Sequence, residues 1–179
     1  MSAAKIYMRM QIGVVFLLII TTVNSCGYEE DTKPIVRGGN PPIIEFSGTG
    51  KLAYLTVSGP FTLEQLKRKY KITGGKNTLT NMTAKQDKEL NEIFGDKNYK
   101  LWQLDPSRHF DVSTISITYG IVPEWCKQVY PANGKPELLI EGQFYLVGAP
   151  SYNANSKTGY FTIKNNKAVM VTDEELGTP

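Results

Sequence analysis

The alternation of apolar and polar residues along the chain predicts extended structure over most of its length. After Pro41, short apolar or alternating runs are separated by glycine, proline and asparagine, which are typical turn residues. A glycine turn separates the first two runs and predicts a hairpin, and the pair Asn165-Asn166 predicts another. We expect strands at 43–47, 52–58, 99–104, 114–119, 125–130, 143–149, 159–164 and 167–171.

Two segments depart from this alternation and carry the signals of a helix start. Thr62 with Gln65, and Thr83 with Gln86, have the spacing of a capping box, in which each side chain bonds a backbone N–H at the start of the helix. A glycine ends the apolar period after each segment. We therefore expect two short helices, inserted between strands at about 61–98.

The number of strands decides the fold class. Seven or eight short strands with turn residues between them are typical of an all-β sandwich. We expect the sandwich to occupy 41–172, with the helical insertion inside it and a C-terminal tail at 173–179. One domain of this size has a sizeable hydrophobic core, with little room for a second.

The stretch LIEGQFYLVGA, residues 139–149, narrows the type of sandwich. A leucine, a glycine and then a tyrosine that opens an alternating strand resemble the E–F corner of fibronectin type III domains. The resemblance implies an immunoglobulin/fibronectin III-like sandwich in which Tyr145 packs over the corner. The helical insertion at 61–98 departs from that family.

The N-terminal residues have the organisation of a secretory signal. Lys5 and Arg9 precede an uncharged apolar run at 12–20, and small and polar residues then lead to Cys26. The last four residues, VNSC, resemble the lipobox of bacterial lipoproteins, which are cut before an acylated cysteine. We expect a signal peptide at 1–25 and lipid attachment at Cys26. An ordinary cleaved signal and an uncleaved anchor are the alternatives.

The segment 26–40 is polar, contains proline and paired glycines and shows no apolar period. It is therefore interpreted as a lipidated flexible tether. Its acidic triplet, Glu29-Glu30-Asp31, resembles the export signal of surface lipoproteins in the Bacteroidetes, and a solvated linker is the alternative. We expect an extracytoplasmic protein that is anchored to a membrane, with the outer membrane or cell surface favoured.

Composition and charge exclude several classes. The chain is 41% hydrophobic and 21% charged, which is neither disordered nor fibrous in type. Of the 20 basic and 17 acidic side chains, Lys5 and Arg9 lie in the leader, so the mature chain has a net charge of +1. This balance gives no reason to expect a nucleic-acid partner.

The reactive side chains are few. If Cys26 carries lipid, Cys126 has no partner for a disulfide, and we expect it to be a buried strand thiol. Asp105, His109 and Asp111 form one cluster with possible metal ligands. Because the cluster lies on a proline-containing loop beside an arginine, we interpret it as a structural loop and expect no metal and no cofactor.

A basic run and a sequon need separate interpretations. The run Lys67, Arg68, Lys69 and Lys71, with Lys76 nearby, is interpreted as the solvated face of a helix, with contact to anionic lipid headgroups as the alternative. The triplet 81–83 matches the glycosylation sequon, but helix capping explains its threonine.

The polar loop 151–157 (SYNANSK) is the candidate ligand loop. Tyr152, Asn153 and Asn155 are residue types that recognition loops use, although any strand-connecting loop also uses them. The stretches NPPIIEFSGTG, ITYGIVPEW and GYFTIKN resemble uncharacterised secreted bacterial proteins, a resemblance that implies no activity.

Catalytic motifs are missing from the sequence. There is no phosphate-binding glycine loop, no paired-histidine zinc motif and no nucleophile elbow. We expect a non-catalytic binding or structural module of the cell envelope, whose partner is an unidentified envelope protein or glycan. An envelope hydrolase that uses loop carboxylates is the alternative.

Overall fold

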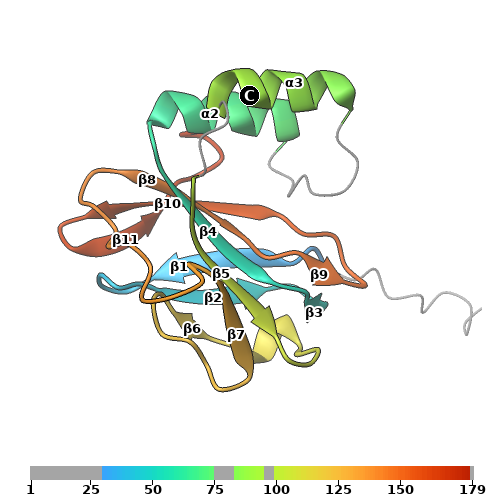
Figure 1. Cartoon of the computed structure of the whole chain (residues 1–179). Helices are drawn as coiled ribbons and strands as arrows, with labels where there is room; N and C mark the ends of the chain where they lie inside the picture. The colour runs from blue at the N-terminus through green and yellow to red at the C-terminus, as the bar shows by residue number, and fades with distance from the viewer. Residues whose placement is uncertain (1–29, 75–82, 95–98, 178–179) are drawn as a thin grey trace, which may run out of the picture.

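A computed structural model describes residues 30–74, 83–94 and 99–177 (Figure 1). These residues form mostly β-strands with two short α-helices, so the expectation of a mainly-β fold is confirmed. The elements are β1 Lys33–Arg37, β2 Ile43–Ser47, β3 Lys51–Leu52, β4 Leu55–Phe61, α2 Leu63–Thr73, α3 Ala84–Phe94, β5 Lys100–Pro106, the 3-10 helix η1 Val112–Thr114, β6 Ile117–Thr118, β7 Cys126–Tyr130, β8 Phe144–Gly148, β9 Ser151–Tyr152, β10 Thr158–Lys164 and β11 Lys167–Met170.

The strands of the described residues form three sheets. The largest has six strands in the order β11-β10-β8-β4-β5-β7, the second has three in the order β1-β2-β6, and the smallest pairs β3 with β9. All neighbouring strands in these sheets are antiparallel. The predicted hairpin at Asn165-Asn166 is confirmed, with both asparagines at positive φ and β10 paired to β11.

The six-stranded and three-stranded sheets pack face to face over one hydrophobic core, which we call the sheet core. Alternation along the strands supplies it, because successive side chains point to opposite faces of a sheet. From β8, Tyr145 and Val147 point into this core. Its largest fully buried side chains are Trp102, Tyr145, Phe161, Ile44, Leu52, Leu55, Leu104, Ile117, Ile163, Val36 and Val57.

The helices cover the other face of the six-stranded sheet, above β4, β8 and β10 in Figure 1. Both predicted capping boxes are present: Thr62 and Gln65 bond each other's backbone N–H at the start of α2, and Thr83 and Gln86 do so before α3. Leu66 of α2 is fully buried in a second core, the helix core. Its other members are Phe61, Tyr70, Tyr160, Val171 and Leu176.

The tether prediction is wrong for the part of 26–40 that folds. Residues 33–37 form β1, which pairs along its whole length with β2. Val36 is 2% exposed and Thr32 is fully buried. The alternation of apolar and polar residues did not predict this strand, because Pro34 is buried in it while the apolar Ile35 faces solvent.

Two further expectations need correction. The predicted hairpin of 43–47 with 52–58 is wrong, because β2 lies in the three-stranded sheet and β4 in the six-stranded sheet, so the glycine segment crosses between sheets. The predicted C-terminal tail is wrong at Leu176, which is 3% exposed in the helix core. Thr172 and Glu175 bond each other there as a capping box does.

The burial expected for Tyr145 is confirmed. Its ring is 1% exposed and its hydroxyl accepts a hydrogen bond of 2.7 Å from the backbone N–H of Ile140. Burial raises the pKa of the Tyr145 hydroxyl. Gly59 lies against the ring, where a Cβ atom would come within 2.5 Å of a ring carbon, so only glycine fits. We call this end of the six-stranded sheet the corner end.

Candidate functional site at the loop end

The opposite end of the sheets, which we call the loop end, gathers segments that are far apart in the sequence (Figure 1). In the two-stranded sheet, Lys51 of β3 pairs with Tyr152 of β9, and Leu52 pairs with Ser151. The candidate ligand loop 151–157 is therefore held against the connection between β2 and β4.

The loop 107–111 joins the same structure. Lys51 also forms a bridge with Asp111, and the backbone N–H of Leu52 donates to the carbonyl of Phe110 at 3.0 Å. The N–H of Val112 donates to the carbonyl of Gly50 at 3.0 Å. The loop that contains His109 and Asp111 and the candidate ligand loop 151–157 are separate in the sequence but thus lie together in the structure.

Thr32 fastens the ligand loop from the N-terminal side. Its N–H donates to the Asn155 carbonyl at 2.8 Å, and its carbonyl accepts from the Lys157 N–H at 2.8 Å. Its buried hydroxyl bonds the Thr49 carbonyl and lies 2.9 Å from the Ser151 Oγ. Sequence analysis missed this residue, because one threonine in a polar segment carries no local signal of such contacts.

Ser151 and Ser156 close the loop on itself. The Ser151 N–H donates to the Ser156 Oγ at 2.9 Å, and the two hydroxyl oxygens are 3.0 Å apart. Gly50 lies below, at a φ of +107°, where a Cβ atom would come within 2.9 Å of the Ala154 Cβ. The loop is therefore rigidly supported, which lowers the entropic cost of binding.

An aromatic pair lies on the surface of this framework. The rings of Tyr152 and His109 meet edge to face, with 4.7 Å between centroids and 72° between planes. Tyr152 is 49% exposed, and His109 is also exposed. A tyrosine that is fixed at one edge and open at the other offers apolar area and a polar group at small entropic cost.

The two asparagines flank this pair as free carboxamides. Asn153 and Asn155 are both exposed, and their side chains make no hydrogen bond within the described residues. Asn153 has a φ of 67°, a left-handed conformation that asparagine tolerates well. Together with Tyr152 they present donors and acceptors next to an aromatic face.

The charges around Tyr152 and His109 are nearly balanced, and some of them are paired with neighbouring groups. The Lys157 Nζ lies 3.4 Å from a carboxylate oxygen of Asp31. The Arg108 guanidinium lies over the Phe110 ring, 4.6 Å from its centroid. The loop end therefore presents no strong field of either sign.

The structure describes no metal site at this loop. Within residues 30–74, 83–94 and 99–177, no group of three or more histidine, cysteine or acidic side chains is placed to hold a metal ion. Asp105 instead accepts a hydrogen bond of 3.1 Å from the Gln103 side chain. Asp111 precedes η1, where its carbonyl accepts from Thr114 at 2.8 Å.

Cys126 is half-buried at the start of β7 and packs against the sheet core. Burial, together with the nearby Asp105 carboxylate, raises the pKa of its thiol to about 11. At neutral pH the thiol is protonated and therefore a poor nucleophile. Cys26, the expected lipid attachment site, lies outside the described residues.

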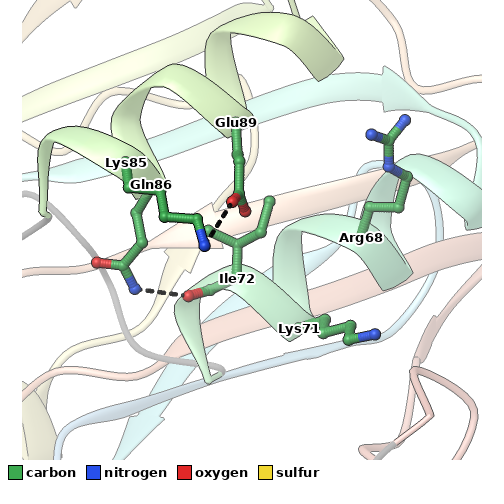
Figure 2. Close-up of a pocket in the computed structure, with 6 residues that line it drawn as sticks. All are labelled: Arg68, Lys71, Ile72, Lys85, Gln86 and Glu89. Atoms are coloured by element: carbon green, nitrogen blue, oxygen red, sulfur yellow. Dashed lines mark hydrogen bonds and ion pairs between the residues drawn. The ribbon is translucent and has the colours of Figure 1, made fainter.

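A groove of about 510 Å³ runs between α2 and α3 (Figure 2), lined by Arg68, Lys71, Ile72, Lys85, Gln86 and Glu89. Ile72 points into it, and the Gln86 side chain donates to the Ile72 carbonyl at 2.8 Å. Lys85 is 3.9 Å from the Glu89 carboxylate, while Lys71 points away from Lys85. The cations of the groove do not converge on one point, so it is not a preformed anion site.

The rest of the basic run has structural contacts. Lys67 lies 3.7 Å from Glu64 one turn earlier. Lys69 lies 6.0 Å from the centroid of the Phe94 ring, and burial lowers its pKa. Lys76, like Asn81 of the sequon, lies outside the described residues. Arg68 and Lys71 are exposed, whereas Lys69 is half-buried beside Phe94, so the run is only in part a solvated face of α2.

Comparisons of the chain with protein-family models, with curated proteins and with solved structures find no match. Among the described residues, no helix has both the length and the apolar character needed to cross a membrane. The functional assignment therefore depends on the sequence pattern and on the geometry of the loop end.

Proposed function

We propose that the protein is a membrane-anchored, extracytoplasmic lipoprotein that serves as a non-catalytic binding or structural module of the cell envelope. The observation that carries the binding role is the exposed pair of Tyr152 and His109 on a loop framework that is fixed by backbone hydrogen bonds. Rigid aromatic side chains with carboxamides beside them are the usual components of recognition loops.

The N-terminal sequence supports the anchor. A basic start, an apolar run at 12–20 and the lipobox-like VNSC precede Cys26, and the folded domain begins only a few residues later. The acylated Cys26 attaches the protein to a membrane, with the outer membrane or cell surface favoured. Its other partner is an envelope protein or glycan.

Strand order supports the immunoglobulin/fibronectin III-like type of sandwich. If β1, β2 and β6 are strands A, B and E, and β4, β8 and β10 are strands C, F and G, the two sheets have the neighbours A-B-E and G-F-C. Such sandwiches place A, B and E in one sheet and C, F and G in the other. Tyr145 then lies at the start of strand F, where a tyrosine corner belongs.

The same strand assignment identifies which connections of the sandwich form the loop end. The ligand loop connects strands F and G, and the segment with β3 connects strands B and C. In variable domains these two connections carry part of the antigen-binding surface, because they project from the same end of the sandwich. This placement is the fold-level support for recognition at Tyr152.

An envelope hydrolase is the alternative, and it would need two carboxylates that converge in a pocket. The groove between α2 and α3 is lined by one carboxylate, that of Glu89. A second cavity of about 180 Å³, beside β10 and β11, is also lined by one, that of Glu175. Neither cavity favours acid–base catalysis by a carboxylate pair.

Two measurements test the proposal. Mass spectrometry of the mature protein should find Cys26 at the N-terminus with acyl chains attached. An unmodified N-terminus at another residue would refute the anchor.

The binding role is tested with the immobilised mature protein and an envelope extract. Replacing Tyr152 and Asn153 by alanine should weaken capture of the partner by at least about tenfold, as expected for an aromatic hot spot. The matched control replaces the exposed Leu138 and Ile140 of the corner end by serine and should leave capture unchanged. Turnover of glycans, esters or peptides that one carboxylate substitution abolishes would refute the non-catalytic role.

A further inference from the structure

The N-terminal segment joins the folded domain at the loop end, and Cys26 precedes this junction by only a few residues. The carbonyl of Glu30 accepts the Thr49 N–H at 3.1 Å, and Asp31 is paired with Lys157. Thr32 is buried and bonded to two segments of the loop end, the ligand loop 151–157 and the segment that contains Thr49. Two of the three residues of the acidic triplet, Glu30 and Asp31, are thus part of the folded structure.

This attachment fixes how far the loop end can lie from the lipid. The five residue steps from Cys26 to Asp31 span at most about 18 Å when fully extended, at about 3.6 Å per residue. A flexible tether through Asn40 would instead have let the domain turn freely. The corner end lies at the other end of β8 and β10, a strand length farther away (Figure 1).

The surface at the loop end matches a headgroup layer. Tyr152 and His109 are amphipathic rings, and tyrosine is enriched where membrane proteins meet the lipid headgroups. Asn153 and Asn155 add hydrogen-bonding groups next to them. The exposed cations Lys51, Arg108 and Lys157 are offset by the acids Glu30, Asp31 and Asp111. Contact between the loop end and the headgroups therefore does not depend on net positive charge.

We propose that the loop end rests on the headgroup layer of the membrane that holds the lipid, with Tyr152 and His109 in contact with it. This inference depends on the proposed lipid anchor at Cys26. It assigns the lipid surface as the partner of the loop end and leaves the corner end directed away from the membrane. A protein or glycan partner at the loop end is the competing outcome. Headgroups that cover Tyr152 exclude such a partner from this surface, so on this inference the envelope partner of the proposed function binds elsewhere on the domain.

The test places a nitroxide label at each end of the full-length, lipidated protein, through Asn153→Cys or Leu138→Cys. Because burial raises the pKa of the Cys126 thiol to about 11, labelling near pH 7 favours the exposed cysteine. Leu138 is 87% exposed and belongs to the corner end, so it is the matched control. Both proteins are reconstituted in phosphatidylethanolamine–phosphatidylglycerol vesicles.

The measured quantity is the collision rate of each label with a water-soluble nickel chelate, from electron paramagnetic resonance saturation. At residue 153 the rate should fall at least about threefold on reconstitution, while the rate at residue 138 stays unchanged, since a headgroup layer excludes the chelate from buried sites. Equal access at both positions would overturn the inference. Protection of residue 153 in native envelope but not in vesicles would overturn it in favour of a protein partner.

Two variations separate the inference from the anchor. Mass spectrometry of the same samples reports acylation of Cys26, so an acylated protein whose residue 153 stays in water refutes only the headgroup contact. A Gly/Ser insertion of about 20 residues after Tyr28 should restore chelate access at residue 153, since its reach exceeds 20 Å. Unchanged protection would show that the short connection does not enforce the contact.

Discussion

The two ends of the six-stranded sheet are built in opposite ways. At the corner end one buried aromatic, Tyr145, fills the junction between strands and bonds the backbone of Ile140. At the loop end the backbone and small hydroxyl residues such as Thr32 provide the support, and the aromatic Tyr152 is left half-exposed. Side-chain burial therefore stabilises the corner end, whereas at the loop end hydrogen bonds hold the backbone in place and leave an aromatic side chain exposed.

Exposure alone would assign function to the wrong end. Leu138 and Ile140, at the corner end, are 87% and 55% exposed, which is more than the 49% of Tyr152. Exposed apolar residues are common on soluble domains. What distinguishes the loop end is that four segments hold its exposed side chains in place.

The largest expected effect comes from removing β1, because this strand pairs along its whole length with β2. The same truncation removes Thr32, which is bonded to the loop end. A chain that begins at Gly38 should lose more than about 3 kcal/mol of unfolding free energy, from the burial of Val36 and the β1–β2 hydrogen bonds.

Urea unfolding measures this loss, and a chain that begins at Glu30 is the control. The control should match the full mature protein, because it keeps both β1 and Thr32. If the shorter chain unfolds at the same urea concentration as the control, β1 contributes little and its pairing with β2 is misassigned.

The next largest effect is expected at the corner. Tyr145→Ala should lower the unfolding free energy by about 3–5 kcal/mol, as large aromatic truncations in cores do. Tyr145→Phe keeps the ring and should cost only about 1 kcal/mol, for the lost acceptor of the Ile140 N–H. A change below about 1 kcal/mol for the alanine variant would refute the corner, since exposed sites show changes of that size.

A smaller effect is expected at the support of the loop end. Thr32→Val removes a buried hydroxyl from the Thr49 carbonyl and Ser151, and should cost about 1–3 kcal/mol. Thr49→Val is the control, because its hydroxyl bond to the Glu30 carbonyl is exposed and of little consequence. Equal melting temperatures for the two variants would mean that the Thr32 hydroxyl does not hold the loop.

The smallest effect on stability is expected at the recognition surface itself. The double variant Tyr152→Ala, Asn153→Ala should lower the unfolding free energy by only about 1 kcal/mol. Both side chains project from the framework, so the main cost is that alanine tolerates the left-handed φ of 67° at residue 153 less well than asparagine does. Calorimetry of this variant beside the wild type checks it. A loss as large as that of Tyr145→Ala would show that the loop is structural.

Local signals in the sequence predicted the elements well. The capping boxes at Thr62 and Thr83, the turn at Asn165-Asn166 and the corner at Tyr145 each depend on residues within a few positions of one another. Such short-range chemistry is readable from one sequence. The type of these elements therefore followed from the pattern, whereas β1 and η1 were not predicted.

Long-range pairing was beyond the sequence. The crossing of 48–54 between sheets, the pairing of β1 with β2 and the burial of Leu176 all depend on contacts with distant segments. The candidate loop was predicted through Tyr152, but its contact with His109, its support by Thr32 and the closeness of Gly50 were not. Tertiary packing decides these contacts, and a short polar segment has no apolar periodicity from which they could be predicted.

One measurement tests the separation of the two ends most directly. A photo-crosslinking amino acid is placed at Tyr152 in one variant and at Leu138 in another, and the full-length proteins are irradiated in intact envelope. Crosslinks to an envelope component should form from residue 152 and be at least about tenfold fewer from residue 138, as the affinity difference of a hot spot implies. Crosslinks that form only from residue 138 would place recognition at the corner end and contradict the account.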